Sequence, residues 1–164
     1  MSLSRAIATV FGVGTLRPAP GTWGSLAALP IFYLIHVTGG FPLVVLATCA
    51  IFGLGWWATA EQTRNSLDHD PSEIVIDEVV GQWLALWSIS ASAWRLEIDV
   101  LQLWPGWLTG FALFRLFDIL KPGPVGWADR RQDALGVMLD DVIAGVCAAV
   151  CVVALAAVAH GVLM

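Results

Sequence analysis

Carboxylates and cations gather in a few short stretches of this 164-residue chain. The acidic pairs Asp77–Glu78 and Asp140–Asp141 stand where apolar segments begin, and Asp118 stands near the end of another. Arg115 and Lys121 each lie three residues from Asp118, so these three side chains share one helix face. Several carboxylates with Arg and Lys nearby suit a divalent cation together with a phosphate. Mg²⁺ is the natural cofactor because it prefers oxygen ligands and is commonly held by one or two carboxylates plus substrate phosphate.

The same residues also have purely structural interpretations. Asp140 could be the N-cap of the last helix, where the helix dipole would favour Asp141. Arg115 and Asp118 could form a structural ion pair, and residues 129–133 could be a solvated loop. Ionisable groups at membrane depth are costly and by default suggest function, however. Their gathering on one side of the protein favours a functional site.

A second candidate site precedes the first apolar segment. Residues 18–25 read PAPGTWGS, in which Gly and Pro shape a tight loop. Thr22 and Ser25 offer hydroxyls and backbone N–H groups at a helix N-terminus, which suits an anion. A plain helix cap followed by a turn explains the same residues, and the sequence leaves both interpretations open.

The composition is that of an integral membrane protein. Apolar residues make up 58% of the chain and charged residues 13%, against roughly 45–50% and 25% in soluble domains. A single unit over residues 1–164 has too little interior to hide so much apolar surface from water. The formal net charge of −5 argues against nucleic acid as a partner, because nucleic acid requires a basic surface.

The apolar stretches predict an all-α, polytopic fold with about five membrane-embedded helices. The uncharged stretch from residue 24 to 60 has turn chemistry at residues 36–42 (HVTGGFP), which indicates a hairpin. Its first arm, 25–35, is shorter than the roughly 20 residues that a bilayer requires. The second arm is 42–60, and the other segments are 79–93, 104–120 and 142–164.

The connections carry their own predictions. Residues 70–73 (DPSE) predict a helix start, with Asp70 as N-cap, Pro71 at the first helical position and Glu73 closing a capping box. Residues 94–103 and 121–139 are expected to be polar loops. Gly81 and Gly145, each four residues before an alanine, predict close contacts between helices.

Five segments place the basic residues unequally on the two sides of the membrane. Only Arg95 falls on the side of the membrane opposite the N-terminus, so the positive-inside rule makes the N-terminal side cytoplasmic. Both acidic pairs and residues 118–131 lie on that same cytoplasmic side. The basic residues on it are Arg5, Arg17, Arg64, Lys121, Arg130 and Arg131.

Four blocks of the sequence resemble the bacterial phosphatidylglycerophosphatase A family. They are APGTWGSLAALP (19–30), IVIDEVVGQW (74–83), FRLFDILKPGPVGWADRR (114–131) and GVMLDDVIAGV (136–146), in the order of the family. The resemblance implies a Mg²⁺-dependent phosphatase of the bacterial inner membrane. Its substrate would be phosphatidylglycerol phosphate, a phospholipid, and its products phosphatidylglycerol and inorganic phosphate. One departure is that the family's Gly-Gly before GVMxDD is absent here, where residues 132–136 read QDALG.

The motifs of the family fall on defined residues of this chain. The expected Mg²⁺ ligands are Asp77, Glu78, Asp118, Asp140 and Asp141. The expected catalytic residues are Asp77, Glu78, Asp118, Lys121 and Asp141. The expected substrate-binding residues are Thr22, Ser25, Arg115, Lys121, Asp129 and Arg130. Attack by a metal-activated water and attack by a carboxylate nucleophile both fit these residues.

Two other classes of function compete with a phosphatase. A small transporter or channel would use carboxylates as an ion path, but the apolar segments 42–60 and 142–164 carry none. An assembly subunit without chemistry would not need so many acidic groups on one side. An alcohol phosphatidyltransferase would show a spaced Asp/Gly signature that this chain lacks. The oligomeric state is not predicted.

Overall fold

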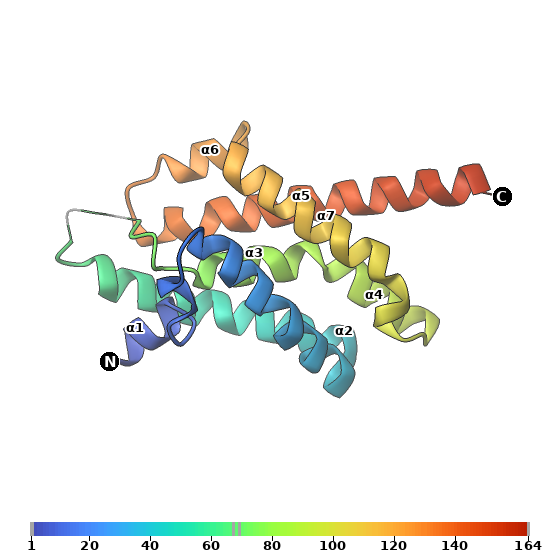
Figure 1. The fold of residues 1–164 in the computed structure, drawn as a ribbon, viewed down its shortest axis with the longest axis horizontal. Coiled ribbons are helices and arrows are strands. Elements are labelled where there is room, and N and C mark those ends of the chain that lie inside the picture. Colours follow the sequence, from blue (N-terminus) through green and yellow to red (C-terminus); the bar gives the residue numbers. More distant parts are fainter. Residues whose placement is uncertain (1, 67, 69, 164) are drawn as a thin grey trace.

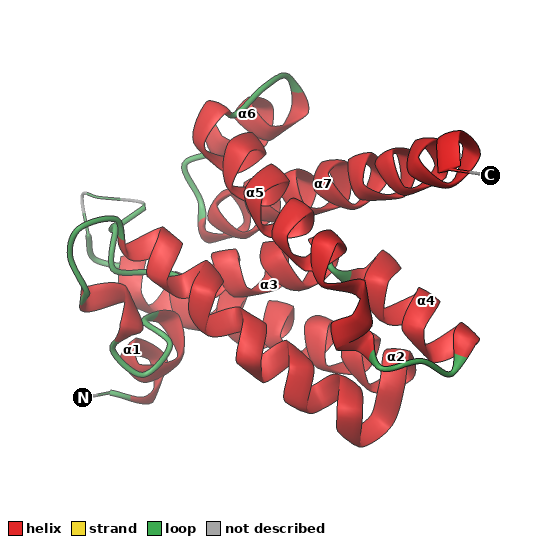
Figure 2. Cartoon of the chain, turned by 45° about the vertical axis from the view of Figure 1, so that its right-hand side comes forward, coloured by secondary structure: helices red, strands yellow, loops and turns green. Residues whose placement is uncertain are grey.

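The computed structural model describes residues 2–66, 68 and 70–163, and every regular element among them is helical (Figure 2). The predicted all-α class is therefore confirmed. The elements are α1 (Leu3–Ala8), η1 (Val13–Thr15), α2 (Pro20–Thr63), α3 (Ile76–Ala85), α4 (Trp87–Leu96), η2 (Val100–Leu103), α5 (Trp104–Leu120), α6 (Pro124–Asp129) and α7 (Ala134–Leu163). The predicted end of the last segment, Met164, lies outside the described residues.

α2 is a hairpin of two helical arms that meet at Gly40. This residue has φ 63° and ψ −161°, a conformation that favours glycine. A Cβ there would lie 2.0 Å from a ring carbon of Trp94, so the close approach of the ring also requires glycine. Figure 1 shows the blue arm and the teal arm of α2 running side by side in opposite directions. The predicted turn is confirmed, but the prediction of a short first arm is wrong, because that arm begins at Pro20.

The predicted helix start at Asp70 is also wrong. α3 begins at Ile76, and Val75 occupies the N-cap position without a side-chain cap. The segment before it is tied to the N-terminus instead: the Val75 N–H donates to Ala8 O at 2.9 Å. The Glu73 carboxylate pairs with Arg5 at 3.1 Å, so it does not close a capping box.

The predicted segment 79–93 is divided in the structure. α3 ends at Ala85 and α4 begins at Trp87, with Leu86 between them, which leaves two helices of ten residues each. α4 continues to Leu96, and Glu97 follows in the left-handed conformation with φ 55°. The expected loop 94–103 therefore holds the end of α4 and the short η2, whereas α5 has the bounds predicted for its segment.

The expected polar loop 121–139 begins where predicted, because α5 ends at Leu120, but its predicted end is wrong. It contains α6, and α7 already begins at Ala134. Asp133, not Asp140, makes the N-terminal bond of this helix: its Oδ1 accepts the Gly136 N–H at 2.7 Å. Asp140 and Asp141 lie inside α7, so the interpretation of Asp140 as an N-cap is wrong.

Among the described residues, two helices, α2 and α7, are long and apolar enough to cross a bilayer, so the prediction of five membrane-embedded helices is not confirmed. α3, α4 and α5 are too short by themselves, at 10, 10 and 17 residues. In α2 and α7 the protein buries only 17% and 22% of the most apolar window. Since so much apolar surface would be exposed to water in a soluble protein, the chain is membrane-associated.

α3 is the central element, packed against α2, α5 and α7. The apolar side chains that α3 buries in the core include Val79, Val80 and Trp83. Figure 1 shows α6 and the segment before α3 at one end of the bundle, and the hairpin turn of α2 and the end of α4 at the other. The buried start of α3 therefore lies where several helix ends meet.

Candidate active site

Close contact between α3 and α7 brings the two acidic pairs together. A Cβ on Gly81 would lie 2.6 Å from Asp141 O, and one on Gly145 would lie 2.3 Å from Gly81 O. The predicted close packing at these glycines is thus confirmed. Asp77 precedes Gly81, and Asp141 precedes Gly145, by four residues, about one helical turn. The glycine contact therefore sets the two aspartates side by side.

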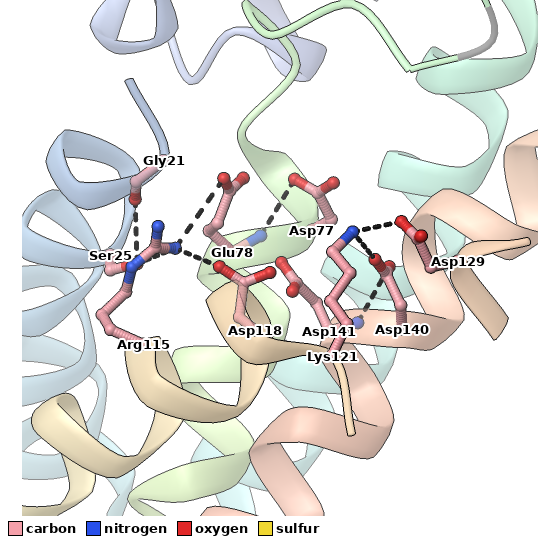
Figure 3. Close-up of polar contacts among 10 residues, drawn as sticks. All are labelled: Gly21, Ser25, Asp77, Glu78, Arg115, Asp118, Lys121, Asp129, Asp140 and Asp141. Carbon is pink, nitrogen blue, oxygen red and sulfur yellow. Dashed lines mark hydrogen bonds and ion pairs between the residues drawn. The ribbon is translucent and has the colours of Figure 1, made fainter. Parts of the chain in front are cut away.

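The carboxylates form two overlapping groups. Ligand oxygens of Asp77, Glu78 and Asp141 lie within 4.8 Å of one another, and so do those of Asp118, Asp140 and Asp141. Asp141 belongs to both groups. Three helices, α3, α5 and α7, supply these five side chains (Figure 3). All the residues predicted as metal ligands are therefore brought together.

The first member of each acidic pair is held in the same way. Asp77 Oδ1 accepts the Glu78 N–H at 2.9 Å, and Asp140 Oδ1 accepts the Asp141 N–H at 3.0 Å. Asp77, Asp140 and Asp141 are only 7%, 5% and 2% exposed. Asp77 keeps its other oxygen outside this local bond, and the other oxygen of Asp140, Oδ2, accepts from Lys121 at 2.8 Å.

Arg115 closes one flank of the cluster. Its guanidinium lies 2.7 Å from Asp118 Oδ2 and 3.9 Å from Glu78 Oε1. It also donates to Ser25 Oγ at 3.4 Å, and that hydroxyl donates to Gly21 O at 2.9 Å. Figure 3 shows this chain of contacts from α2 to α3 and α5. Ser25 thus reaches the cluster through Arg115.

Gly21 is a site residue that the sequence analysis did not identify. A Cβ at this position would lie 2.1 Å from Glu78 Oε1 and 3.1 Å from a guanidinium nitrogen of Arg115. Any side chain here would displace the carboxylate. The sequence feature that could have indicated this role is the position of Gly21 beside Thr22 and Ser25 in the APGTWGS block.

Lys121 closes the other flank. It ends α5 in the left-handed conformation, with φ 45°, which turns it toward α6 and α7. Its ammonium donates to Asp140 Oδ2 at 2.8 Å and to Asp129 Oδ1. Burial by itself lowers the pKa of Lys121, but the bonds to the two carboxylates outweigh this and raise the pKa above its usual value. The lysine therefore stays charged.

Negative charge exceeds positive charge in the cluster: its five carboxylates face two cations, Arg115 and Lys121. Burial, followed by repulsion from Glu78, raises the pKa of Asp77 well above its usual range. Burial likewise raises the pKa of Glu78 to about 8. Among the described residues, Glu78 Oε2 and Asp141 Oδ1 are buried with no hydrogen-bond partner. Buried oxygens that lack partners, in a donor set of carboxylates, fit a hard divalent cation such as Mg²⁺.

Two predicted substrate residues lie outside these contacts. Thr22 is half-buried in the first turn of α2, and Arg130 is exposed at the end of α6. Neither side chain makes a hydrogen bond or ion pair with another residue of the described ranges. Beside the cluster, Asp70 lines a cavity of about 260 Å³ together with Asp129 and Asp140. Nothing in its sequence spacing indicated this place for Asp70.

Comparison with known proteins identifies relatives over most of the chain. The family model described as Phosphatidylglycerophosphatase A matches residues 6–156. The Phosphatidylglycerophosphatase A of Haemophilus influenzae is 36% identical over 151 residues, which cover 91% of this chain and 86% of the relative. That of Escherichia coli is 34% identical over 147 residues, covering 87% and 77%. No solved structure matches the chain.

A third relative has a different name. A Bacteroides thetaiotaomicron protein named as a candidate phosphatidylinositol-3-phosphatase is 36% identical over 145 residues, covering 85% of each chain.

The fold, the site and these matches together define the class of protein. The chain is an enzyme, a phosphatase that hydrolyses phosphoric monoesters, built as an all-helical membrane-associated protein. Within that class, it belongs to the phosphatidylglycerophosphatase A family. The resemblance seen in the four sequence blocks is thereby confirmed.

Proposed function

We propose that this protein is a Mg²⁺-dependent phosphatase that converts phosphatidylglycerol phosphate into phosphatidylglycerol and inorganic phosphate. The reaction breaks the bond between phosphorus and the oxygen of the headgroup glycerol, and the oxygen of water joins the phosphate. The observation that carries the proposal is the presence of two sets of three close carboxylates, both of which include Asp141. The family supports the substrate.

The metal ligands in this proposal are Asp77, Glu78, Asp118, Asp140 and Asp141. Bound Mg²⁺ would polarise the phosphoryl oxygens and lower the pKa of a coordinated water. The buried unpartnered oxygens Glu78 Oε2 and Asp141 Oδ1 support a cation between these side chains. With the cation present, the excess negative charge of the cluster is offset.

Lys121 is the residue that we propose to hold the phosphate. An ammonium has three donors, and here two of them are occupied by Asp129 and Asp140. The third is available to a phosphoryl oxygen, and fixed charge there stabilises charge that develops in the transition state. Arg130 is exposed, and its side chain makes no hydrogen bond or ion pair among the described residues, so it can add a second contact to the phosphate.

Arg115 has a different part in the proposal. One guanidinium nitrogen, Nη1, contacts Asp118, Glu78 and Ser25. Because two of these partners are carboxylates of the cluster, we assign Arg115 the role of fixing them in place. Ser25 supports Arg115 in this position and is a positioning residue as well.

The proposed enzyme crosses the bacterial inner membrane several times, with its site on the cytoplasmic face. Two observations support this topology. α2 and α7 are long and apolar enough to span, and successive segments alternate between the two ends of the bundle (Figure 1). α1, which contains Arg5, and the end of α5, which Lys121 follows, lie at the end of the bundle that holds the site, whereas α4, which contains Arg95, ends at the other. This is the distribution expected for a cytoplasmic site.

The test is phosphate release from phosphatidylglycerol phosphate by detergent-purified full chain, with Mg²⁺ and with excess EDTA. We expect release only with Mg²⁺, and a loss of at least about 100-fold in kcat for Asp141→Asn, since this residue serves both groups. Glu61→Gln, which changes a carboxylate paired with Arg64 away from the site, is the matched control. Release in EDTA, or full activity of Asp141→Asn, would contradict the proposal.

A parallel assay decides the headgroup. Phosphatidylinositol 3-phosphate is offered under the same conditions, because one relative carries a name of that kind. We expect kcat/KM to favour phosphatidylglycerol phosphate. A preference for the inositol lipid would retain the metal site but overturn the proposed substrate.

A further inference from the structure

One polar side chain in the interior of the bundle has no part in the reaction proposed above. Gln82, in α3, is fully buried, and neither its amide nitrogen nor its amide oxygen has a hydrogen-bond partner among the described residues. Burying an amide without a hydrogen bond is costly, and most buried polar side-chain atoms in proteins have a partner. The surroundings of Gln82 indicate what this cost supports.

Gln82 lies one helical turn after Glu78, deeper in the bundle. Side chains four residues apart are neighbours on a helix, with Cβ atoms about 5–6 Å from one another. Glu78 belongs to the carboxylate cluster, and its Oε2 is also buried without a partner within the described ranges. A buried amide therefore lies next to a proposed metal ligand.

The residues before and after Gln82 show which way it faces. A Cβ on Gly81 would lie 2.4 Å from a ring carbon of Phe114 in α5. The Trp83 indole N–H donates to a backbone carbonyl of α2 at 2.9 Å. Successive helical residues differ in direction by about 100°, so Gln82 points between α5 and α2. Arg115 bridges the same two helices, from α5 to a hydroxyl of α2.

Two side chains on this side of α3 lack the partners that an amide supplies. Glu78 Oε2 lacks a donor, and Arg115 Nε, which is also buried, lacks an acceptor in the part of the chain that the structure describes. These two side chains already approach each other, with Arg115 Nη1 3.9 Å from Glu78 Oε1. An amide carries donors on its nitrogen and an acceptor on its oxygen. Gln82 therefore has the chemistry to join the carboxylate to the guanidinium.

We propose that Gln82 is a positioning residue of the metal centre. When Mg²⁺ is bound, its amide N–H donates to Glu78 Oε2 and its amide oxygen accepts from Arg115 Nε, directly or through one buried water. The Glu78 carboxylate is thereby held in the orientation that ligates the metal. The inference rests on the proposed function, and it adds a residue that touches neither the metal nor the substrate.

The test is Mg²⁺ binding by the metal-free, detergent-purified full chain, followed through the rise in Tm as Mg²⁺ is added. Gln82→Met nearly keeps the size of the side chain and removes both polar atoms. We expect its Mg²⁺ affinity to fall at least about 10-fold, because losing a group that hydrogen-bonds a metal ligand costs about 10–100-fold. Ser88→Ala, which removes another buried hydroxyl without a partner among the described residues, in α4, is the matched control and should keep the wild-type affinity.

The Tm of the metal-free protein separates positioning from structural support. An amide without partners adds no hydrogen bond to the metal-free fold, so an apolar group of similar shape should be neutral or stabilising there. We therefore expect metal-free Gln82→Met to unfold at the wild-type Tm or above it. A lower Tm, or an unchanged Mg²⁺ affinity, would overturn the role of Gln82.

The wild-type protein distinguishes this failure from failure of the proposed function. A wild-type Tm that does not respond to Mg²⁺ would refute the metal centre itself. A wild-type response that Gln82→Met retains in full would refute only the inference about Gln82.

Discussion

The two cations that flank the carboxylate cluster differ in burial and in the shape of their charged groups. Arg115 is 14% exposed and contacts two carboxylates with the same exposure, and it also reaches Ser25. Lys121 is 30% exposed and retains an ammonium donor beyond its bonds to Asp129 and Asp140. Arginine presents a rigid fork that suits fixed, buried pairs, whereas lysine is a flexible point charge. The comparison indicates that one flank holds the site together and the other meets the substrate.

Removing the buried cation is the largest perturbation that this comparison predicts. Arg115→Ala leaves the Asp118 carboxylate as a buried charge without its partner, and breaking such a pair costs about 3–5 kcal/mol. We expect a correspondingly lower free energy of unfolding in detergent, measured without Mg²⁺ by denaturant titration. Arg95→Ala, an exposed arginine at the other end, is the control. Equal stability of the two variants would show that Arg115 does not hold the cluster.

Removing the more exposed cation should separate activity from stability. We expect Lys121→Ala to lower kcat by about 10²–10³-fold, because a fixed charge at the phosphate is lost, with a smaller loss of unfolding free energy than in Arg115→Ala. Steady-state phosphate release and denaturant titration measure the two quantities. If Lys121→Ala is the less stable of the two and keeps its activity, the proposed roles of the flanks are reversed.

Crowding the arginine flank should have the smallest effect of the three. Gly21→Ala places a methyl group against the Glu78 carboxylate, and we expect overpacking to destabilise the protein by about 1–3 kcal/mol. Gly53→Ala, where nothing lies within 4 Å of the added methyl, is the matched control within the same helix. That control should gain about 0.5–1 kcal/mol, since alanine favours helix over glycine. The difference between the two alanine variants, read by thermal unfolding, measures how closely Glu78 is packed; no difference would contradict the close approach.

Local features of the sequence predicted local features of the structure. The bounds of α5, the turn within the first apolar stretch and the glycines at the α3–α7 contact all follow from hydrophobic runs or small-residue spacing. The helix start at Asp70 failed because its signal was also local. There the N-terminal segment holds Glu73 and Val75 from a distance in sequence, and such contacts override a capping motif.

The sequence by itself determined that this is an apolar, all-helical chain of the phosphatidylglycerophosphatase A family, and it singled out the carboxylates that we propose as metal ligands. The tertiary structure decided how they meet: Asp141 shared between two groups, Arg115 bound to Glu78 across helices, and Lys121 joined to Asp140. It also revealed the role of Gly21 and the burial of the Gln82 amide. The physical reason is that helix formation and membrane burial depend on runs of neighbouring residues. Contacts between helices depend instead on how closely the helices approach and which faces they turn to one another, and these are properties of the packed bundle.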